Sequence, residues 1–212
     1  MRVATAVPVP TGAAARAPAM WGLTCAGIAV ASIGALHVLA AGTVDPIRST
    51  ISEYALGSFG LLFHVGVLAL AGGAALVLAA LLRTGQVRAA SAASVLYGIG
   101  MAGLVPVVVF EKTNWAIGPS VSGSIHRYAS LVAFVALPLG VALVARRVGA
   151  RWAKLLGAGS LAWLVAIFAG IAFARLAERP WWQVLPLGLM ERGLALTLVA
   201  AVVALGVWVV RQ

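Results

Sequence analysis

Six long apolar runs constrain this chain more than any other feature of its sequence. Short polar connections separate the runs, which cover Met20–Ala41, Ser58–Leu82, Ala90–Phe110, Tyr128–Ala145, Ala153–Ala174 and Leu187–Val210. About 20 apolar residues are enough for a helix to cross the hydrocarbon core of a bilayer. Backbone groups in lipid must be hydrogen-bonded within their own segment, which favours helices over isolated strands. The sequence therefore predicts an all-α, polytopic integral membrane protein built as a bundle of six transmembrane helices.

Composition excludes a soluble globular domain. Of the 212 residues, 63% are hydrophobic and 9% are charged, whereas soluble domains carry about 25% charged residues. The net charge of +10 would be compatible with nucleic-acid binding in a soluble chain. Here the basic residues flank apolar runs, so we expect them to meet anionic lipid headgroups and to set orientation, with no nucleic-acid partner.

Basic residues are distributed unequally between the two sides of the predicted bundle. The side that holds both termini has nine: Arg2, Arg16, Arg83, Arg88, Arg146, Arg147, Arg151, Lys154 and Arg211. The other side has six basic residues and all five acids of the chain, Asp45, Glu53, Glu111, Glu178 and Glu191. The positive-inside rule then predicts cytoplasmic termini for a multi-pass protein of the cell membrane. Residues 1–19 are expected to be a disordered cytoplasmic tail and residues 20–212 the transmembrane domain, with the first run retained as a span.

The stretch "DPIRSTISEYALG", Asp45–Gly57, is unusually polar for its position between two apolar runs. Asp45 can cap a helix that starts at Pro46, and Gly57 can end it. This pattern predicts a short amphipathic helix at the membrane interface. It is either a solvated connector or a lid over a cavity, and in the second case its ligand-binding candidates are Asp45, Arg48, Ser49, Ser52 and Tyr54.

Two adjacent charges, Glu191 and Arg192, lie at least one turn inside the last apolar run. Charges at that depth are costly unless they are paired or hydrated, so each is a candidate functional group or half of a structural ion pair. Adjacent helical residues diverge by about 100°, so the two need separate partners. The candidates are Arg127 and His126 for Glu191, and Glu111 and Glu53 for Arg192.

The three histidines suggest two further kinds of site. His37 and His64 each lie about six residues, or roughly 9 Å, below the outer ends of the first two spans. If they face one another they are metal-ligand candidates, and a zinc site would need His126 or a carboxylate as well. His126, which opens the predicted fourth span, could also act with Glu191 or Glu53 as a catalytic acid–base pair. Histidines that only hydrogen-bond between helices are the alternative.

Three local patterns carry a resemblance to a known family. "DPIRSTISEYALGSFG" follows the first span, His126 opens the fourth, and "GLMERG" opens the last. Over about Trp21 to Val210 the chain resembles a bacterial membrane family known as domain of unknown function nine-nine-eight, which implies six helices and no established activity. It is more loosely similar to the Frag1/DRAM/Sfk1 group and to the alkaline ceramidase superfamily, whose members use serine, histidine and aspartate on zinc. The last span of this chain lacks the HxxxH pair of that superfamily.

The sequence leaves three classes of function open. One is a polar extracytoplasmic site that binds or processes an outer-leaflet lipid, in which Glu111, Arg127 and Arg192 would join the ligand-binding residues of Asp45–Gly57. A second is a non-catalytic membrane component that binds lipid or a partner protein. The third is a small-molecule transporter, although the predicted fifth span has few polar residues in its interior to form a path.

Overall fold

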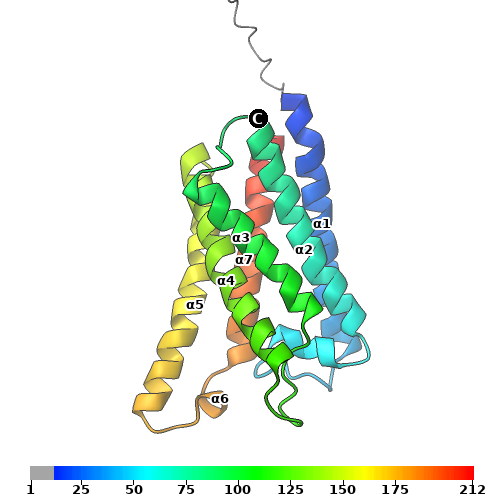
Figure 1. The fold of residues 1–212 in the computed structure, drawn as a ribbon, viewed down its shortest axis with the longest axis vertical. Helices are drawn as coiled ribbons and strands as arrows, with labels where there is room; N and C mark the ends of the chain where they lie inside the picture. The colour runs from blue at the N-terminus through cyan, green and yellow to red at the C-terminus, as the bar shows by residue number, and fades with distance from the viewer. Residues whose placement is uncertain (1–11) are drawn as a thin grey trace, which may run out of the picture.

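The computed structural model describes residues 12–212, which form helices and no strand over that range (Figure 1). The six long helices are α1 (Gly12–Leu39), α2 (Gly60–Arg83), α3 (Ala92–Val109), α4 (Val121–Val148), α5 (Arg151–Leu176) and α7 (Leu187–Val210). Two short elements lie between them, the 3-10 helix η1 (Ile51–Leu56) and α6 (Trp181–Val184). Each of the six long helices is long and apolar enough to cross a membrane. The predicted six-helix fold is therefore confirmed.

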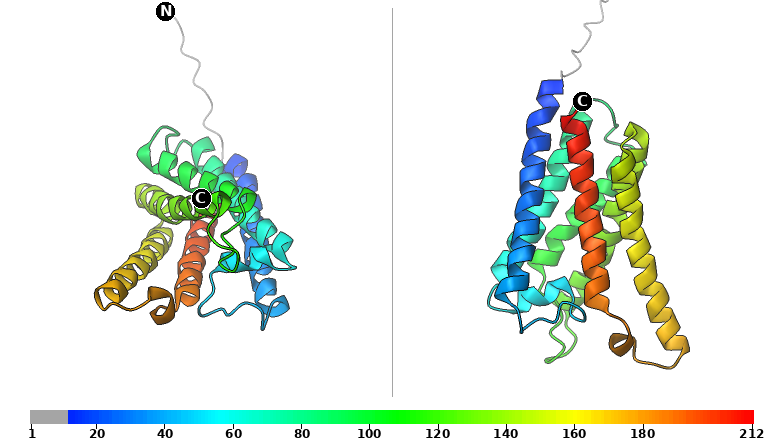
Figure 2. Two further views of the ribbon diagram at one scale, coloured as in Figure 1. Left: turned by 60° about the horizontal axis from the view of Figure 1, so that its bottom comes forward. Right: turned by 180° about the vertical axis from the view of Figure 1, so that it is seen from behind.

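The connections gather at the two ends of the bundle. The start of α1 and the end of α7 lie at one end, which we call the termini end (Figure 1). The opposite end, the loop end, carries the segments 40–59, 110–120 and 177–186, and with them η1 and α6 (Figures 1 and 2). All the polar loops singled out in the sequence therefore lie together at the loop end.

Close helix contacts hold the half of the bundle nearest the termini end. A Cβ atom on Gly73 of α2 would lie 2.8 Å from the carbonyl oxygen of Gly22 on α1. A Cβ on Gly100 of α3 would lie 2.1 Å from the backbone nitrogen of Leu137 on α4. Small residues let membrane helices approach this closely. The largest buried cluster, which includes Tyr97, Leu137 and Leu198, fills this half of the molecule.

Two helices begin more than one turn earlier than the sequence predicted. Helix α4 starts at Val121, where the Ser120 side chain accepts a hydrogen bond from Gly123 N at 2.9 Å as an N-cap. His126 therefore lies inside α4, not at its start. Helix α1 starts at Gly12 instead of Met20, because its alanine-rich first turns favour helix and bury Ala15 and Ala19 against the core. Residues 12–19, which the sequence analysis placed in the tail, belong to α1, and residues 1–11 lie outside the described part of the chain.

The predicted Asp45–Gly57 helix does not form as one element. Residues 45–49 make a turn in which the Asp45 side chain accepts a hydrogen bond from Ile47 N at 2.8 Å, and only Ile51–Leu56 is helical. In a continuous helix, Ile51 N would donate to the carbonyl oxygen of Ile47. Here α7 takes both groups, since Leu189 N donates to Ile47 O at 3.0 Å and Ile51 N donates to Glu191 Oε2 at 3.3 Å. Contacts with α7 thus outweigh the local helical pattern.

Candidate functional site

A cavity of about 330 Å³ lies in the half of the bundle nearest the loop end. Helices α1, α2, α3, α4 and α7 surround it, and Ile51 and Ser52 of η1 cover it. Its walls are largely apolar: Ala29, Val30, Ile33, Gly34, Phe63, Gly66, Val67, Leu70, Leu104, Val107, Ala133, Phe134, Ala195, Leu196 and Val199. The volume is at the lower end of the range of small-molecule sites, about 300–1,000 Å³.

Polar lining residues are concentrated where the cavity meets η1. His37, Ser52, Glu191 and Arg192 lie there, and Ser130 of α4 is the remaining polar residue of the lining. The Ser130 hydroxyl donates to the carbonyl oxygen of His126 at 2.9 Å, so it is occupied within its own helix. The cavity is therefore amphipathic, with a polar cap under η1 and an apolar shaft below it.

The shaft opens to the side of the bundle between α1 and α7. Val30 and Gly34 on α1 and Leu196 on α7 line the cavity and are also exposed, Val30 to 51% and Leu196 to 67%. These two helices lie side by side in the view from behind (Figure 2, right). In a membrane, this surface of membrane-spanning helices faces hydrocarbon. The opening therefore lies on the lateral surface of the bundle.

Arg192 ties three segments of the chain to α7. Its Nε donates to His37 Nε2 at 2.7 Å, and its Nη1 donates to Ser49 O at 2.7 Å and to Gly188 O at 3.0 Å. Its Nη2 donates to Tyr54 Oη at 3.3 Å, and Cζ lies 5.7 Å from the centroid of the Tyr54 ring. A guanidinium has five N–H donors, so four of them are used by neutral acceptors of the protein.

The hydrogen bonds fix the tautomer of His37. Its Nδ1 lies 2.7 Å from the carbonyl oxygen of Ile33, which can only accept, so Nδ1 carries the hydrogen. Its Nε2 faces the guanidinium of Arg192, which can only donate, so Nε2 is the acceptor. The ring also packs edge-on against Tyr54, with centroids 5.4 Å apart. His37 is thus a neutral partner of Arg192, and both of its ring nitrogens are occupied.

Glu191 has much less protein around its carboxylate. Within residues 12–212 its one hydrogen bond is the long contact from Ile51 N, 3.3 Å, to Oε2. The one ion pair in that range joins Lys112 to Glu53, so Glu191 has no basic side chain at ion-pair distance. A carboxylate can accept about four hydrogen bonds. Glu191 therefore presents unused acceptor capacity at the cavity, and the partners that the sequence predicted for it were wrong.

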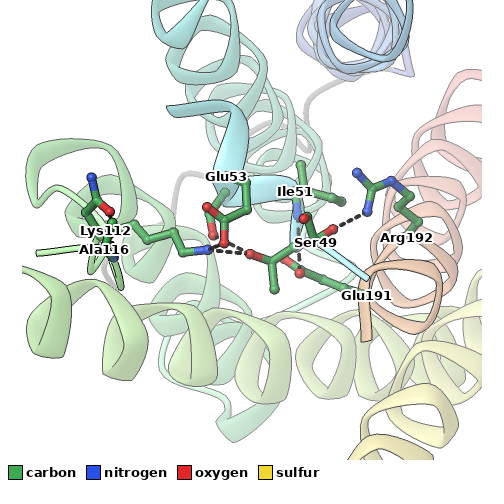
Figure 3. Close-up of polar contacts among 10 residues, drawn as sticks. Ser49, Ile51, Glu53, Lys112, Ala116, Glu191 and Arg192 are labelled. Carbon is green, nitrogen blue, oxygen red and sulfur yellow. Dashed lines mark hydrogen bonds and ion pairs between the residues drawn. The ribbon is translucent and has the colours of Figure 1, made fainter. Parts of the chain in front are cut away.

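A second polar group lies on the other side of the Ser49–Ile51 segment (Figure 3). Lys112 pairs with Glu53 and also donates to Thr50 Oγ1 at 2.8 Å. Thr50 Oγ1 lies 3.1 Å from Ser52 Oγ, which reaches the cavity. The Lys112–Glu53 pair joins η1 to the loop after α3 and neutralises Glu53. Because it is the one ion pair within residues 12–212, neither Glu53 nor Glu111 pairs with Arg192. Lys112 and Thr50 were not among the predicted site residues, although Lys112 follows directly after Glu111 at the end of an apolar run.

The structure leaves four of the predicted ligand-binding residues outside the cavity. Asp45 is exposed and caps its own turn, and the Arg48 guanidinium donates to Gln183 O at 2.9 Å on the surface. Glu111 is exposed, and its backbone carbonyl accepts from Ser122 Oγ at 3.0 Å. Arg127 is exposed and stacks over Tyr128, with Cζ 5.4 Å from the ring centroid. Ser52 and Arg192 line the cavity, while Ser49 and Tyr54 reach it through Arg192.

The three predicted catalytic residues do not share one pocket. Only Glu191 lines the cavity, and Glu53 is held by Lys112. His126 is 5% exposed, and its Nδ1 lies 3.0 Å from the carbonyl oxygen of Phe110, so it joins the end of α3 to α4. In the described part of the chain His126 makes no hydrogen bond to either acid. His126 therefore hydrogen-bonds between two helices, which is the structural alternative that the sequence analysis named for the histidines.

The two metal-ligand candidates also have other neighbours. His37 is engaged by Arg192 and Ile33, while the His64 ring packs against Phe63 with centroids 5.8 Å apart. Across residues 12–212, no group of three or more His, Cys, Asp or Glu side chains is placed to hold a metal ion. The donor set of the cavity, one carboxylate and one occupied imidazole, does not fit the zinc site considered from the sequence.

Residues 23–208 match the family described as "Protein of unknown function (DUF998)". The chain belongs to this family. The match covers α2 to α5 completely, α1 from Leu23 onward and α7 up to Trp208, and it includes the whole polar cap, so the cavity is part of the family's domain. No curated protein and no solved structure gives a significant match. The resemblance to domain of unknown function nine-nine-eight is confirmed, and that family carries no activity that could be transferred.

Proposed function

We propose that this protein binds an amphipathic, lipid-like molecule, with its apolar chain in the shaft and its polar head under η1. The observation that carries the proposal is the cavity itself, which is polar at one end, apolar along its walls and open to the side between α1 and α7. An amphiphile in a bilayer has the same distribution of polarity along its length. Such a molecule could enter sideways without leaving the membrane.

Binding from a bilayer places the selectivity of the site at its polar end. A chain that moves from lipid into an apolar shaft exchanges one apolar environment for another, so burial of the chain adds little driving force. Contacts of the head with the cap then decide which molecule is held. The cap provides Glu191, Ser52 and the Arg192–His37 pair for this purpose.

The proposal is limited to binding. His126, the candidate general base, does not line the cavity, and the half of the bundle nearest the termini end is filled by buried side chains such as Tyr97, Leu137 and Leu198. A filled half supports a closed site more than a path through the membrane. We further propose that the loop end faces the extracytoplasmic side of the cell membrane, because the basic residues without acidic neighbours lie at the termini end.

Gly34 offers a direct test at the lateral opening. A Cβ built on Gly34 meets no atom within 4 Å, so Gly34→Leu adds bulk to the opening without a clash in the bundle. Gly27 is the matched control. It lies about two turns away on nearly the same face of α1, is also exposed with no atom within 4 Å of a built Cβ, and does not line the cavity.

The assay is photo-crosslinking in nanodiscs with a lipid that carries a diazirine on its acyl chain, followed by peptide mapping. We expect crosslinks on the cavity walls of α1 and α7 in the native protein and in Gly27→Leu, and a strong loss of them in Gly34→Leu. Labelling spread evenly over outward residues such as Val165 and Phe168 of α5, with no response to Gly34→Leu, would refute binding in the shaft.

A further inference from the structure

We propose that the cap selects a head that donates hydrogen bonds and carries positive charge, a protonated amine, and that Glu191 is the residue that recognises it. This inference rests on the proposed function and specifies the chemical class of the ligand. It follows from comparing which hydrogen-bonding groups of the cap the protein already uses and which it leaves free.

The basic side chain of the cap, Arg192, and the one beside the cap, Lys112, are both occupied. Four of the five donors of Arg192 are directed to His37, Ser49, Gly188 and Tyr54. An anionic head would have to compete with these neutral acceptors, which also hold the loop in place. Lys112 is paired with Glu53, donates to Thr50 and does not line the cavity. The cap is therefore poor in free donors.

The cap has hydrogen-bond acceptors that the protein leaves unused. Glu191 lines the cavity, has one long hydrogen bond from Ile51 N at 3.3 Å, and has no basic side chain at ion-pair distance within the described residues. A carboxylate in an apolar setting is costly unless it is paired. A protonated amine supplies both the compensating charge and several N–H donors, and charge-assisted hydrogen bonds of this kind are the strong ones.

The balance of acidic and basic side chains around the cap is compatible with a protonated amine as the head. The cap and the Lys112–Glu53 pair beside it hold two basic side chains, Arg192 and Lys112, and two acidic ones, Glu53 and Glu191, so there is no excess of basic groups that would attract an anion. Glu53 is neutralised directly by Lys112. Arg192 is adjacent to Glu191 in sequence, but its donors point to α1, to the Ser49 carbonyl and to Tyr54. The carboxyl group of Glu191 is therefore the acidic group that remains for a ligand.

The test compares three probes of equal chain length: dodecylamine, dodecanol and dodecanoate. Each competes at neutral pH with a diazirine-bearing dodecyl photoprobe in nanodiscs, and crosslinks to the cavity walls are counted by peptide mapping. We expect dodecylamine to displace the photoprobe at a concentration about tenfold or more below that of dodecanoate, with dodecanol between them.

Two variants assign the preference to a residue. Glu191→Gln should abolish the preference for the amine over the carboxylate. The control Glu111→Gln removes the same charge from an exposed acid of the loop end that lies outside the cavity, and it should leave the preference unchanged.

The experiment distinguishes a failure of the proposed function from a failure of the inference about the head. No crosslink to the cavity by any probe would overturn the proposed function itself. Cavity labelling that dodecanoate displaces as well as dodecylamine does, or a preference that survives in Glu191→Gln, would overturn the inference about the head and leave binding in the shaft intact. If Glu191→Gln does not fold, the preference measured on the native protein still decides, because equal displacement by amine and carboxylate refutes the inference alone.

Discussion

Replacing Arg192 by methionine should destabilise the protein more than any other single change at the loop end. The substitution keeps an unbranched chain of similar length and removes all N–H donors. It breaks the contacts from α7 to His37 on α1, to the Ser49 carbonyl and to Tyr54 on η1. The change therefore removes the links from α7 to three other segments of the loop end.

The structure permits an estimate of the loss. Hydrogen bonds to charged groups contribute about 1.5–3 kcal/mol each, so three of them on other segments would sum to roughly 4–9 kcal/mol. They act as one network and are not additive, and removing Arg192 also removes the cost of keeping its charge half-buried. Each acceptor that Arg192 leaves unsatisfied costs about 1–3 kcal/mol, so a net loss of about 3–5 kcal/mol is the better estimate.

A matched control is available in the same loop. Arg48 is exposed and makes a single hydrogen bond, to the Gln183 carbonyl at 2.9 Å. Exposed interactions of this kind contribute about 0–1 kcal/mol, so Arg48→Met should leave stability nearly unchanged. Both variants remove one positive charge, which means that the difference between them isolates the network of Arg192.

The native cysteine provides the assay. Cys25 is the single cysteine of the chain and is half-buried in α1, so a thiol-reactive fluorophore reports its exposure on unfolding. In maltoside micelles we expect the midpoint of Arg192→Met to fall by about 6–20 °C, using the scaling of roughly 2–4 °C per kcal/mol for chains of this size. A fall no larger than that of Arg48→Met would refute a structural role for Arg192 and would free its charge for an anionic ligand.

Two further predictions concern packing and orientation. Gly100→Ala should abolish or severely reduce folded protein in size-exclusion chromatography, because its Cβ would lie 2.1 Å from Leu137 N, whereas Gly98→Ala on the same helix meets nothing within 4 Å and should be tolerated. In a background without the native cysteine, a membrane-impermeant thiol reagent added to intact cells should label Ser122→Cys and not Gly85→Cys. The reverse pattern would overturn the proposed orientation of the loop end.

Several features of the fold could be predicted from the sequence alone, because they depend on the transfer free energy of each segment summed over its own residues. Transfer of about 20 apolar residues into hydrocarbon is favourable whatever the neighbouring helices are, so all six spans were found, and Leu187–Val210 was found to the residue. An even number of crossings then places both termini at one end of the bundle and the polar stretch Asp45–Gly57 at the other. The site was expected at that end for the same reason.

Helix ends were less predictable, because they depend on single hydrogen bonds and on distant packing. Ser120 caps α4 earlier than the apolar pattern begins. The Asp45–Gly57 pattern is a good local match to a short helix, yet α7 takes the Ile47 carbonyl and the Ile51 N–H that such a helix would join to each other. Nothing within the segment signals that competition.

Which polar groups meet was decided only by the tertiary structure. His37 and Arg192 are 155 residues apart. From the sequence, His37 was a candidate for a metal ligand or for an interhelix hydrogen bond, and Arg192 was a candidate for an ion pair with an acid or for ligand binding. The acceptors of Arg192 are an imidazole, a phenol and two backbone carbonyls. Every residue has a backbone carbonyl, so the sequence does not indicate which of them will accept a hydrogen bond. The small residues Gly22, Gly73 and Gly100 pack one half of the bundle tightly while the other half encloses a cavity. Apolarity decides that each helix lies in the membrane, but the helix contacts decide which side chains face the cavity, because lipid and protein interior are equally apolar surroundings for a leucine.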